Sequence, residues 1–129
     1  MDHTADLAVE MWAPTQEELL IVGARAIIEI LTEGCPVTPD AVREIAIDGI
    51  DPEDRLVQWL NEIIYAAVTG GFLFAGGKLC LGDTTLVARI QGQSNALDVI
   101  RTELKSVTYH DLSLRREAGV WRAFVVIDV

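Results

Sequence analysis

Apolar residues recur along this chain with two periods, and each change of period marks an element. In residues 7–12 every second residue is a large apolar one, which predicts a strand that ends before a proline. In residues 16–33 the apolar residues fall three or four positions apart, the spacing of one buried helix face. Thr15 and Glu18 stand three residues apart, as in a capping box, so we expect this helix to begin there.

A second strand and a second helix follow. Ile45 and Ile47 alternate with acidic neighbours, which predicts a strand. Asp51 followed by Pro52 is a strong helix start, because aspartate caps free backbone N–H groups and proline suits the first helical position. The apolar residues of 56–67 then form a second buried stripe, which a pair of glycines ends.

The rest of the chain reads as a series of strands. The expected strands are residues 72–81, 85–90, 108–114 and 120–127. Gly76 and Gly77 inside the first of these favour a bulge or a tight bend. Between the second and the third, Asn95 could cap a short helix through Ile100. The last strand is largely apolar at both parities, which favours a central strand covered on both faces.

The order strand, helix, strand, helix and then four strands is the order expected of an α+β fold. We therefore predict an α/β sandwich of about six mostly antiparallel strands and two main helices. A chain of 129 residues, half of them hydrophobic, suits one domain with one core across residues 1–129 and excludes a disordered protein.

The chain is strongly acidic, with a formal net charge of -10 at pH 7. Such a charge repels the phosphate backbone of nucleic acids, so direct, tight nucleic-acid binding is not expected. It suits metal ions or a protein partner with a basic surface.

The cysteines and the apolar runs bear on the compartment. Cys35 and Cys80 stand in neither a CxxC motif nor a Cys/His metal spacing, and free thiols in a reducing compartment are favoured over a disulfide. The acidic N-terminus lacks the apolar core of a signal peptide, and no apolar run reaches membrane-spanning length. We expect a soluble, cytoplasmic protein without a membrane segment, and the oligomeric state stays open.

The first and last strands carry acidic residues where each could meet the other. If these strands pair antiparallel, Asp6, Asp128 and the terminal carboxylate of Val129 converge. Like charges held close together do not all stay ionised without a cation, so the convergence predicts a metal site. Oxygen donors favour a hard divalent cation, which is calcium, magnesium or manganese rather than zinc.

Two histidines stand near these residues. His3 lies between Asp2 and the next carboxylate, and it could be a general base, a metal ligand or a residue held by a carboxylate. His110 follows Lys105 and Tyr109 in a short polar segment, which could support the site or could be a polar strand on a partly wet sheet. On a regular strand, side chains two residues apart in 108–111 would share a face.

Four blocks of the sequence, in order, resemble those of the archease family. They are residues 2–6 (DHTAD), 56–65 (LVQWLNEIIY), 104–110 (LKSVTYH) and 125–129 (VVIDV). The resemblance implies a small α/β protein that acts as a protein cofactor of the RNA-splicing ligase, which joins 2′,3′-cyclic phosphate or 3′-phosphate RNA ends to 5′-hydroxyl ends, notably in tRNA splicing. It implies that the protein promotes guanylylation of the ligase and its turnover, with Asp6, Asp128 and Val129 as metal ligands.

Two other functions remain open at this point. A stand-alone, metal-dependent phosphohydrolase could use Asp6, Asp128 and the two histidines, although no Walker-type loop, dinucleotide motif or recognisable nucleophile setting occurs. A chaperone-like scaffold would instead leave the acidic chain ends solvated.

Overall fold

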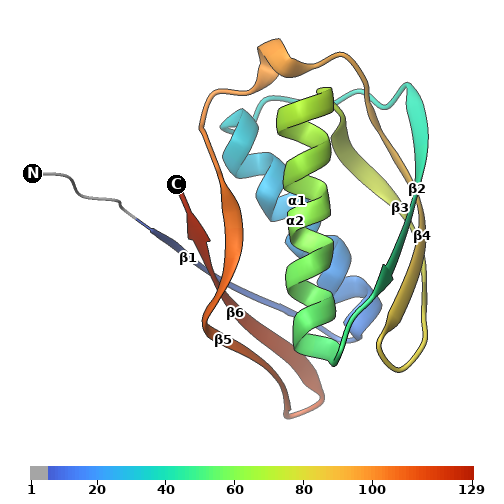
Figure 1. The fold of residues 1–129 in the computed structure, drawn as a ribbon, viewed down its shortest axis with the longest axis vertical. Coiled ribbons are helices and arrows are strands. Elements are labelled where there is room, and N and C mark those ends of the chain that lie inside the picture. The colour runs from blue at the N-terminus through green and yellow to red at the C-terminus, as the bar shows by residue number, and fades with distance from the viewer. Residues whose placement is uncertain (1–5) are drawn as a thin grey trace, which may run out of the picture.

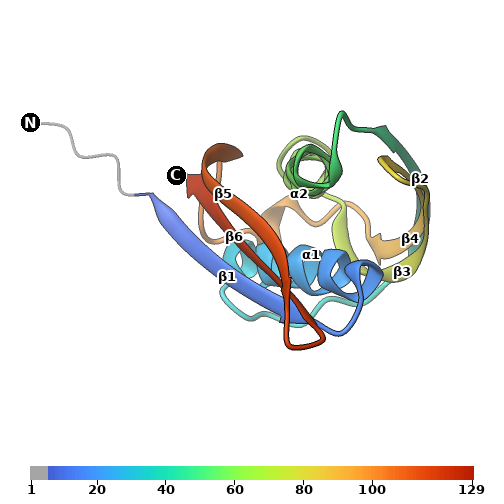
Figure 2. The same ribbon diagram turned by 90° about the horizontal axis from the view of Figure 1, so that it is seen from below.

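The computed structural model describes residues 6–129, in which two three-stranded antiparallel sheets stand on either side of two helices (Figures 1 and 2). One sheet has the strand order β1-β6-β5 and the other has the order β2-β4-β3. The elements are β1 (Leu7–Ala13), α1 (Gln16–Thr32), β2 (Ala41–Asp48), α2 (Pro52–Gly70), β3 (Leu73–Leu81), β4 (Thr85–Gln93), the 3₁₀ helix η1 (Leu97–Val99), β5 (Ser106–Glu117) and β6 (Val120–Asp128). The predicted α+β sandwich of six strands and two main helices is confirmed.

Both helices begin at the predicted capping residues. The Glu18 N–H donates to Thr15 Oγ1 at 3.1 Å, and the Asp54 N–H donates to Asp51 Oδ1 at 2.7 Å. Each bond satisfies a backbone donor that the first helical turn leaves without a partner. The two N-terminal signals therefore place the helices, which lie between the sheets (Figure 2) and contribute their apolar residues to one core.

The core is built where the two helices meet. Trp59 is fully buried, and its indole N–H donates to the Leu20 carbonyl of α1 at 2.8 Å. Its ring meets Phe74 of β3 edge to face at 6.0 Å between centroids. Gly23 allows the close approach of α1, because a Cβ there would lie 3.0 Å from both Leu60 Cδ2 and Met11 Sδ.

Arg55 fastens the β3–β4 turn to both helices. Its buried guanidinium donates to the carbonyls of Gly82 at 2.8 Å and Thr85 at 3.1 Å, and to Gln16 Oε1 at 2.8 Å. Burial lowers the pKa of this side chain. These charge-assisted bonds connect the sheet β2-β4-β3 to the start of α1.

The loop between β4 and β5 departs from the expected helix. Asn95 adopts the left-handed region at φ 53° and does not cap a helix, because η1 follows Ala96 without a side-chain cap. The Ala96 N–H donates to the Gly71 carbonyl at 2.9 Å, so the end of α2 fixes this turn. The bulge expected near Gly76 is confirmed, since the register of β3 shifts between Phe74 and Gly76.

The strand β6 lies between β1 and β5, as its apolar sequence indicated. Its inward residues, such as Val125, are buried against the helices. The prediction that both faces are covered holds only in part, because α1 and α2 pack on one face (Figure 2), whereas the other face carries the half-buried Phe124 beside the buried Val126. Side-chain stacking covers part of that outer face, where the Arg122 guanidinium lies 5.7 Å from the Trp12 ring centroid.

Candidate metal site

The candidate site forms where β1 begins and β6 ends. The two strands pair antiparallel, with Leu7 opposite Ile127, so Asp6 and Asp128 flank the same end of the ladder. Their side chains are within hydrogen-bonding contact of each other. Both views show the end of β6 beside the start of β1 (Figures 1 and 2). The folded chain thus brings together two carboxylates from nearly opposite ends of the sequence.

The electrostatics of the pair follow from this contact. The hydrogen bond with Asp128 raises the pKa of Asp6 above its ordinary value, and desolvation and charge repulsion by Asp128 act in the same direction. His110 acts in the opposite direction, because a nearby imidazolium favours the ionised carboxylate. Two adjacent carboxylates repel each other when both are ionised, and a bound cation would offset that repulsion.

The strand β5 carries a large bulge beside this pair. Thr108 stands opposite Val126 and Ser113 opposite Phe124, so residues 109–112 loop out where β6 has one residue. The alternation of faces expected for residues 108–111 does not hold, because a bulge interrupts the period of two. No local sequence signal marked the bulge, since its register depends on pairing with a strand elsewhere in the chain.

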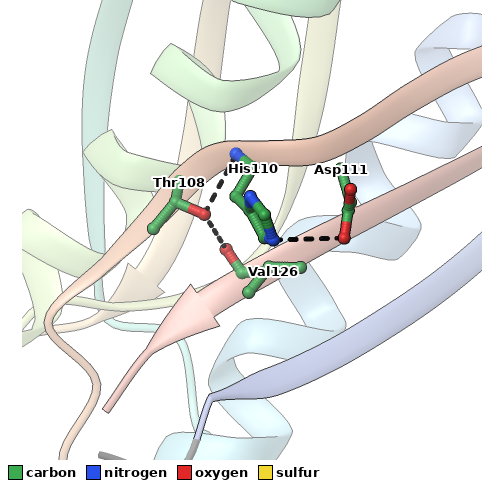
Figure 3. A network of polar contacts seen from close by, with 4 residues as sticks. All are labelled: Thr108, His110, Asp111 and Val126. Atoms are coloured by element: carbon green, nitrogen blue, oxygen red, sulfur yellow. Dashed lines mark hydrogen bonds and ion pairs between the residues drawn. The ribbon is translucent and has the colours of Figure 1, made fainter.

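Thr108 fixes the start of the bulge and the position of His110 (Figure 3). Its Oγ1 donates to the Val126 carbonyl at 3.1 Å and accepts from the His110 N–H at 3.3 Å. The imidazole Nε2 lies 3.2 Å from Asp111 Oδ2, and Asp111 takes the left-handed region at φ 54°. Sequence reasoning did not count Asp111 among the site residues, and the structure shows it as an exposed carboxylate in contact with His110.

Tyr109 points to the helix α2 rather than to the carboxylate pair. Its hydroxyl donates to Asp54 Oδ1, while Asp54 Oδ2 accepts from the Ile50 N–H at 3.0 Å and from Gln58 Nε2 at 2.7 Å. These donors lower the pKa of Asp54, and the bond to Asp54 raises the pKa of Tyr109. Tyr109 therefore connects β5 to α2, and its predicted supporting role at the site stays a prediction.

The remaining expected residues lie at the same end of the sheet or outside the described part of the chain. The Lys105 N–H donates to the Asp128 carbonyl at 2.9 Å, so Lys105 lies beside the pair through its backbone. Val129 follows Asp128 and is half-buried, packed against the core. Asp2 and His3 lie outside the described residues, so their predicted supporting roles stay predictions.

The donor set fits a hard cation held by few protein ligands. Across residues 6–129, no group of three or more His, Cys, Asp or Glu side chains is arranged to hold a metal ion. Two adjacent carboxylates, Asp6 and Asp128, are what the described side chains provide at this site. Hard cations such as magnesium are commonly held by one or two carboxylates, with water and substrate phosphates completing the shell.

The described helices bear on membrane association as well. In the part of the chain that the structure covers, neither long helix combines the length and apolar character needed to cross a membrane.

Comparisons with known proteins extend over the whole chain. The model of the archease protein family matches residues 1–129. The protein archease of Methanopyrus kandleri is 34% identical over 139 residues, which cover 100% of this chain and 96% of that protein. The protein archease of Methanosarcina barkeri is 29% identical over 136 residues, which cover 100% of this chain and 93% of that protein.

Solved structures show the same fold. The solution structure of Methanobacterium thermoautotrophicum protein 1598 has a TM-score of 0.78 at 26% identity and covers 100% of this chain and 96% of its own. A crystal structure from Thermotoga maritima, described as an archease and possible chaperone, has a TM-score of 0.72 at 24% identity and covers 100% of this chain and 94% of its own.

Proposed function

Because this chain belongs to the archease family, we propose that it is a metal-binding protein cofactor of an RNA-splicing ligase. In this role it promotes guanylylation of the ligase and multiple turnover in tRNA splicing and RNA repair, without catalysis of its own. The observation that carries the proposal is the contact between Asp6 and Asp128 at the paired ends of β1 and β6.

Two side-chain carboxylates leave coordination positions of a bound metal open, and an open metal site suits a protein that acts together with a partner. Asp6 and Asp128 would hold a calcium, magnesium or manganese ion, with Val129 as a further ligand. When bound, the ion supplies positive charge to phosphate oxygens during phosphoryl transfer. Thr108 and His110 keep the bulge of β5 beside the carboxylates and so shape the site that faces the partner.

The charge of the whole chain supports a basic partner. A ligase that binds RNA, nucleotide and metal presents a basic cleft, and a protein of net charge -10 is attracted to it. Opposite potentials raise the association rate and orient the encounter. Tight binding to the RNA itself is not part of the proposal, since phosphates and this chain repel each other.

The test removes each carboxylate separately. Asp6→Asn and Asp128→Asn should each lower stimulation of ligase guanylylation at least tenfold, because one carboxylate alone holds a hard cation weakly. The same variants should lose calcium, magnesium or manganese binding in calorimetric titration. Asp48→Asn is the matched control, since Asp48 is an exposed carboxylate at the end of β2 in the other sheet, and it should stimulate like the wild type.

Two further results decide between this role and its rivals. Full stimulation by a folded Asp6→Asn or Asp128→Asn variant would refute the metal role. Metal-dependent turnover of phosphoesters by the pure protein, with no ligase present, would favour the stand-alone phosphohydrolase. Stimulation that persists in a chelator would favour the scaffold role.

A further inference from the structure

The edge strands of the two sheets differ in how they are protected from pairing with another chain. A strand at the edge of a sheet exposes unpaired N–H and C=O groups, which invite pairing with another chain unless a feature prevents it. In β2 the inward-pointing Arg43, whose guanidinium stacks 4.6 Å from the Phe72 ring centroid, is such a feature. In β3 the bulge between Phe74 and Gly76, together with Lys78 further along, disrupts a straight edge.

The edge strand β5 is protected in two ways. Residues 109–112 form the bulge described above. In addition, the side chain of Asn61 on α2 binds the strand as a neighbouring strand would: Asn61 Nδ2 donates to the Val107 carbonyl at 3.1 Å, and the Val107 N–H donates to Asn61 Oδ1 at 2.6 Å. The outer edge of β5 is therefore partly occupied from within the molecule.

The edge strand β1 has none of these features. Residues 7–13 pair with β6 without a register shift and contain no proline, lysine or arginine. The inward positions of the strand are all apolar, and its single charged residue is Glu10. Within residues 6–129 no other strand lies along its second edge, and Trp12 near its end is 56% exposed. The free edge of β1 is therefore available to pair with a strand of another protein.

We propose that the free edge of β1 binds an extended, basic segment of the partner protein, which adds a fourth strand to the sheet β1-β6-β5. This inference rests on the proposed function, in which the partner is the RNA-splicing ligase. Backbone hydrogen bonds would provide the affinity, and the exposed Trp12 would provide an apolar contact.

Charge and position favour a basic segment of the ligase, rather than a second copy of this chain, on the edge of β1. A second copy of the chain would bring two molecules of net charge -10 together, which repel each other. A segment with lysine or arginine matches Glu10 on the strand and the Asp6–Asp128 pair at its start. Because β1 begins directly after Asp6, a strand paired along it reaches the candidate metal site.

The test is amide hydrogen exchange of the full chain, alone and with the purified ligase of the same organism. In the free protein, alternate amides of β1 should exchange fast, because they point away from β6. Binding of the ligase should slow these amides at least tenfold and leave the amides on the free edge of β2 unchanged. Protection that instead appears without ligase, and grows with protein concentration, would mean a second copy and overturn the inference.

A proline variant then tests the edge directly. Proline at a fast-exchanging position of β1 removes a donor that only a partner strand uses, so the fold is kept while ligase affinity falls at least tenfold. Proline placed by the same criterion in β2 is the control and should bind normally. Ligase binding with β1 amides still unprotected would overturn the docking mode and leave the proposed function standing. Protected β1 amides without stimulation of guanylylation would overturn the proposed function and leave the docking mode.

Discussion

At the scale of single residues, two carboxylates of this acidic chain, Asp6 and Asp54, have opposite surroundings. Asp6 faces another carboxylate, which raises its pKa and prepares it for a cation. Asp54 faces only donors, namely Tyr109, the Ile50 N–H and Gln58, and its pKa is lowered. The raised pKa of Asp6 beside another carboxylate marks a candidate binding site, whereas the hydrogen bonds that lower the pKa of Asp54 hold the fold together.

Tyr109→Phe tests how its hydroxyl affects Asp54. A carboxylate with a lowered pKa contributes stability above its unfolded pKa, and this contribution is lost as the pH falls through the folded pKa. Without the phenol, the pKa of Asp54 should move back toward 3.8. The variant should therefore lose more unfolding free energy at pH 7 than at a pH below the folded pKa of Asp54. NMR titration of the Asp54 carboxyl and urea unfolding at both pH values measure this.

The control for that experiment is Tyr65→Phe. Tyr65 is 64% exposed on α2, and its hydroxyl should not affect Asp54. An unchanged Asp54 titration in Tyr109→Phe would show that the phenol does not hold this carboxylate in solution.

The pairing of Asp6 with Asp128 was accessible to sequence reasoning, because it required only that the first and last strands be antiparallel neighbours. The surroundings of the pair were not accessible. Asp111 reaches His110 only because four residues of β5 bulge out, and Asn61 reaches Val107 only because α2 packs beside β5. Both depend on contacts between distant segments, which local periodicity does not encode.

At the scale of elements, start signals were more informative than end signals. Thr15 and Asp51 cap the helices as predicted. The first helix, by contrast, ends at Thr32, and its C-cap Glu33 takes the left-handed region, one residue before the glycine that would favour that conformation. The division of six strands into two sheets was also beyond the sequence pattern, because alternation gives the faces of a strand but not its neighbours.

Asn61→Ala tests how α2 holds the sheet β1-β6-β5. Losing both bonds to Val107 should cost about 2 kcal/mol of unfolding free energy, since one donor and one acceptor of the edge lose their partners. Exchange of the Val107 amide should accelerate as well. Glu62→Ala removes the exposed neighbouring side chain and should change stability by less than about 0.5 kcal/mol. Equal effects of the two changes in urea unfolding would argue against the role given to Asn61.

At the scale of the whole molecule, the helices lie between the sheets and the outer faces stay open (Figure 2). The charge of -10 is therefore carried on surfaces that a partner can reach. Salt screens such charges beyond about 10 Å at 0.1 M.

Association with the ligase should therefore weaken with salt. Raising the ionic strength from about 0.05 M to about 0.5 M should slow association on the order of tenfold and change dissociation much less, because steering acts on the encounter. Stopped-flow binding measures both rates. A rate of association that is independent of salt would remove the electrostatic argument for a basic partner.

The pairing of β1 with β6 also has a consequence during synthesis. The middle strand of the sheet β1-β6-β5 follows both of its neighbours in the chain, so β1 and β5 have no common neighbour until β6 leaves the ribosome. Contacts of such high sequence separation form late, because the long intervening loop must close first. The two carboxylates consequently meet only after β6 has been made, and a nascent or truncated chain that lacks β6 is unable to compete for the metal or for the partner.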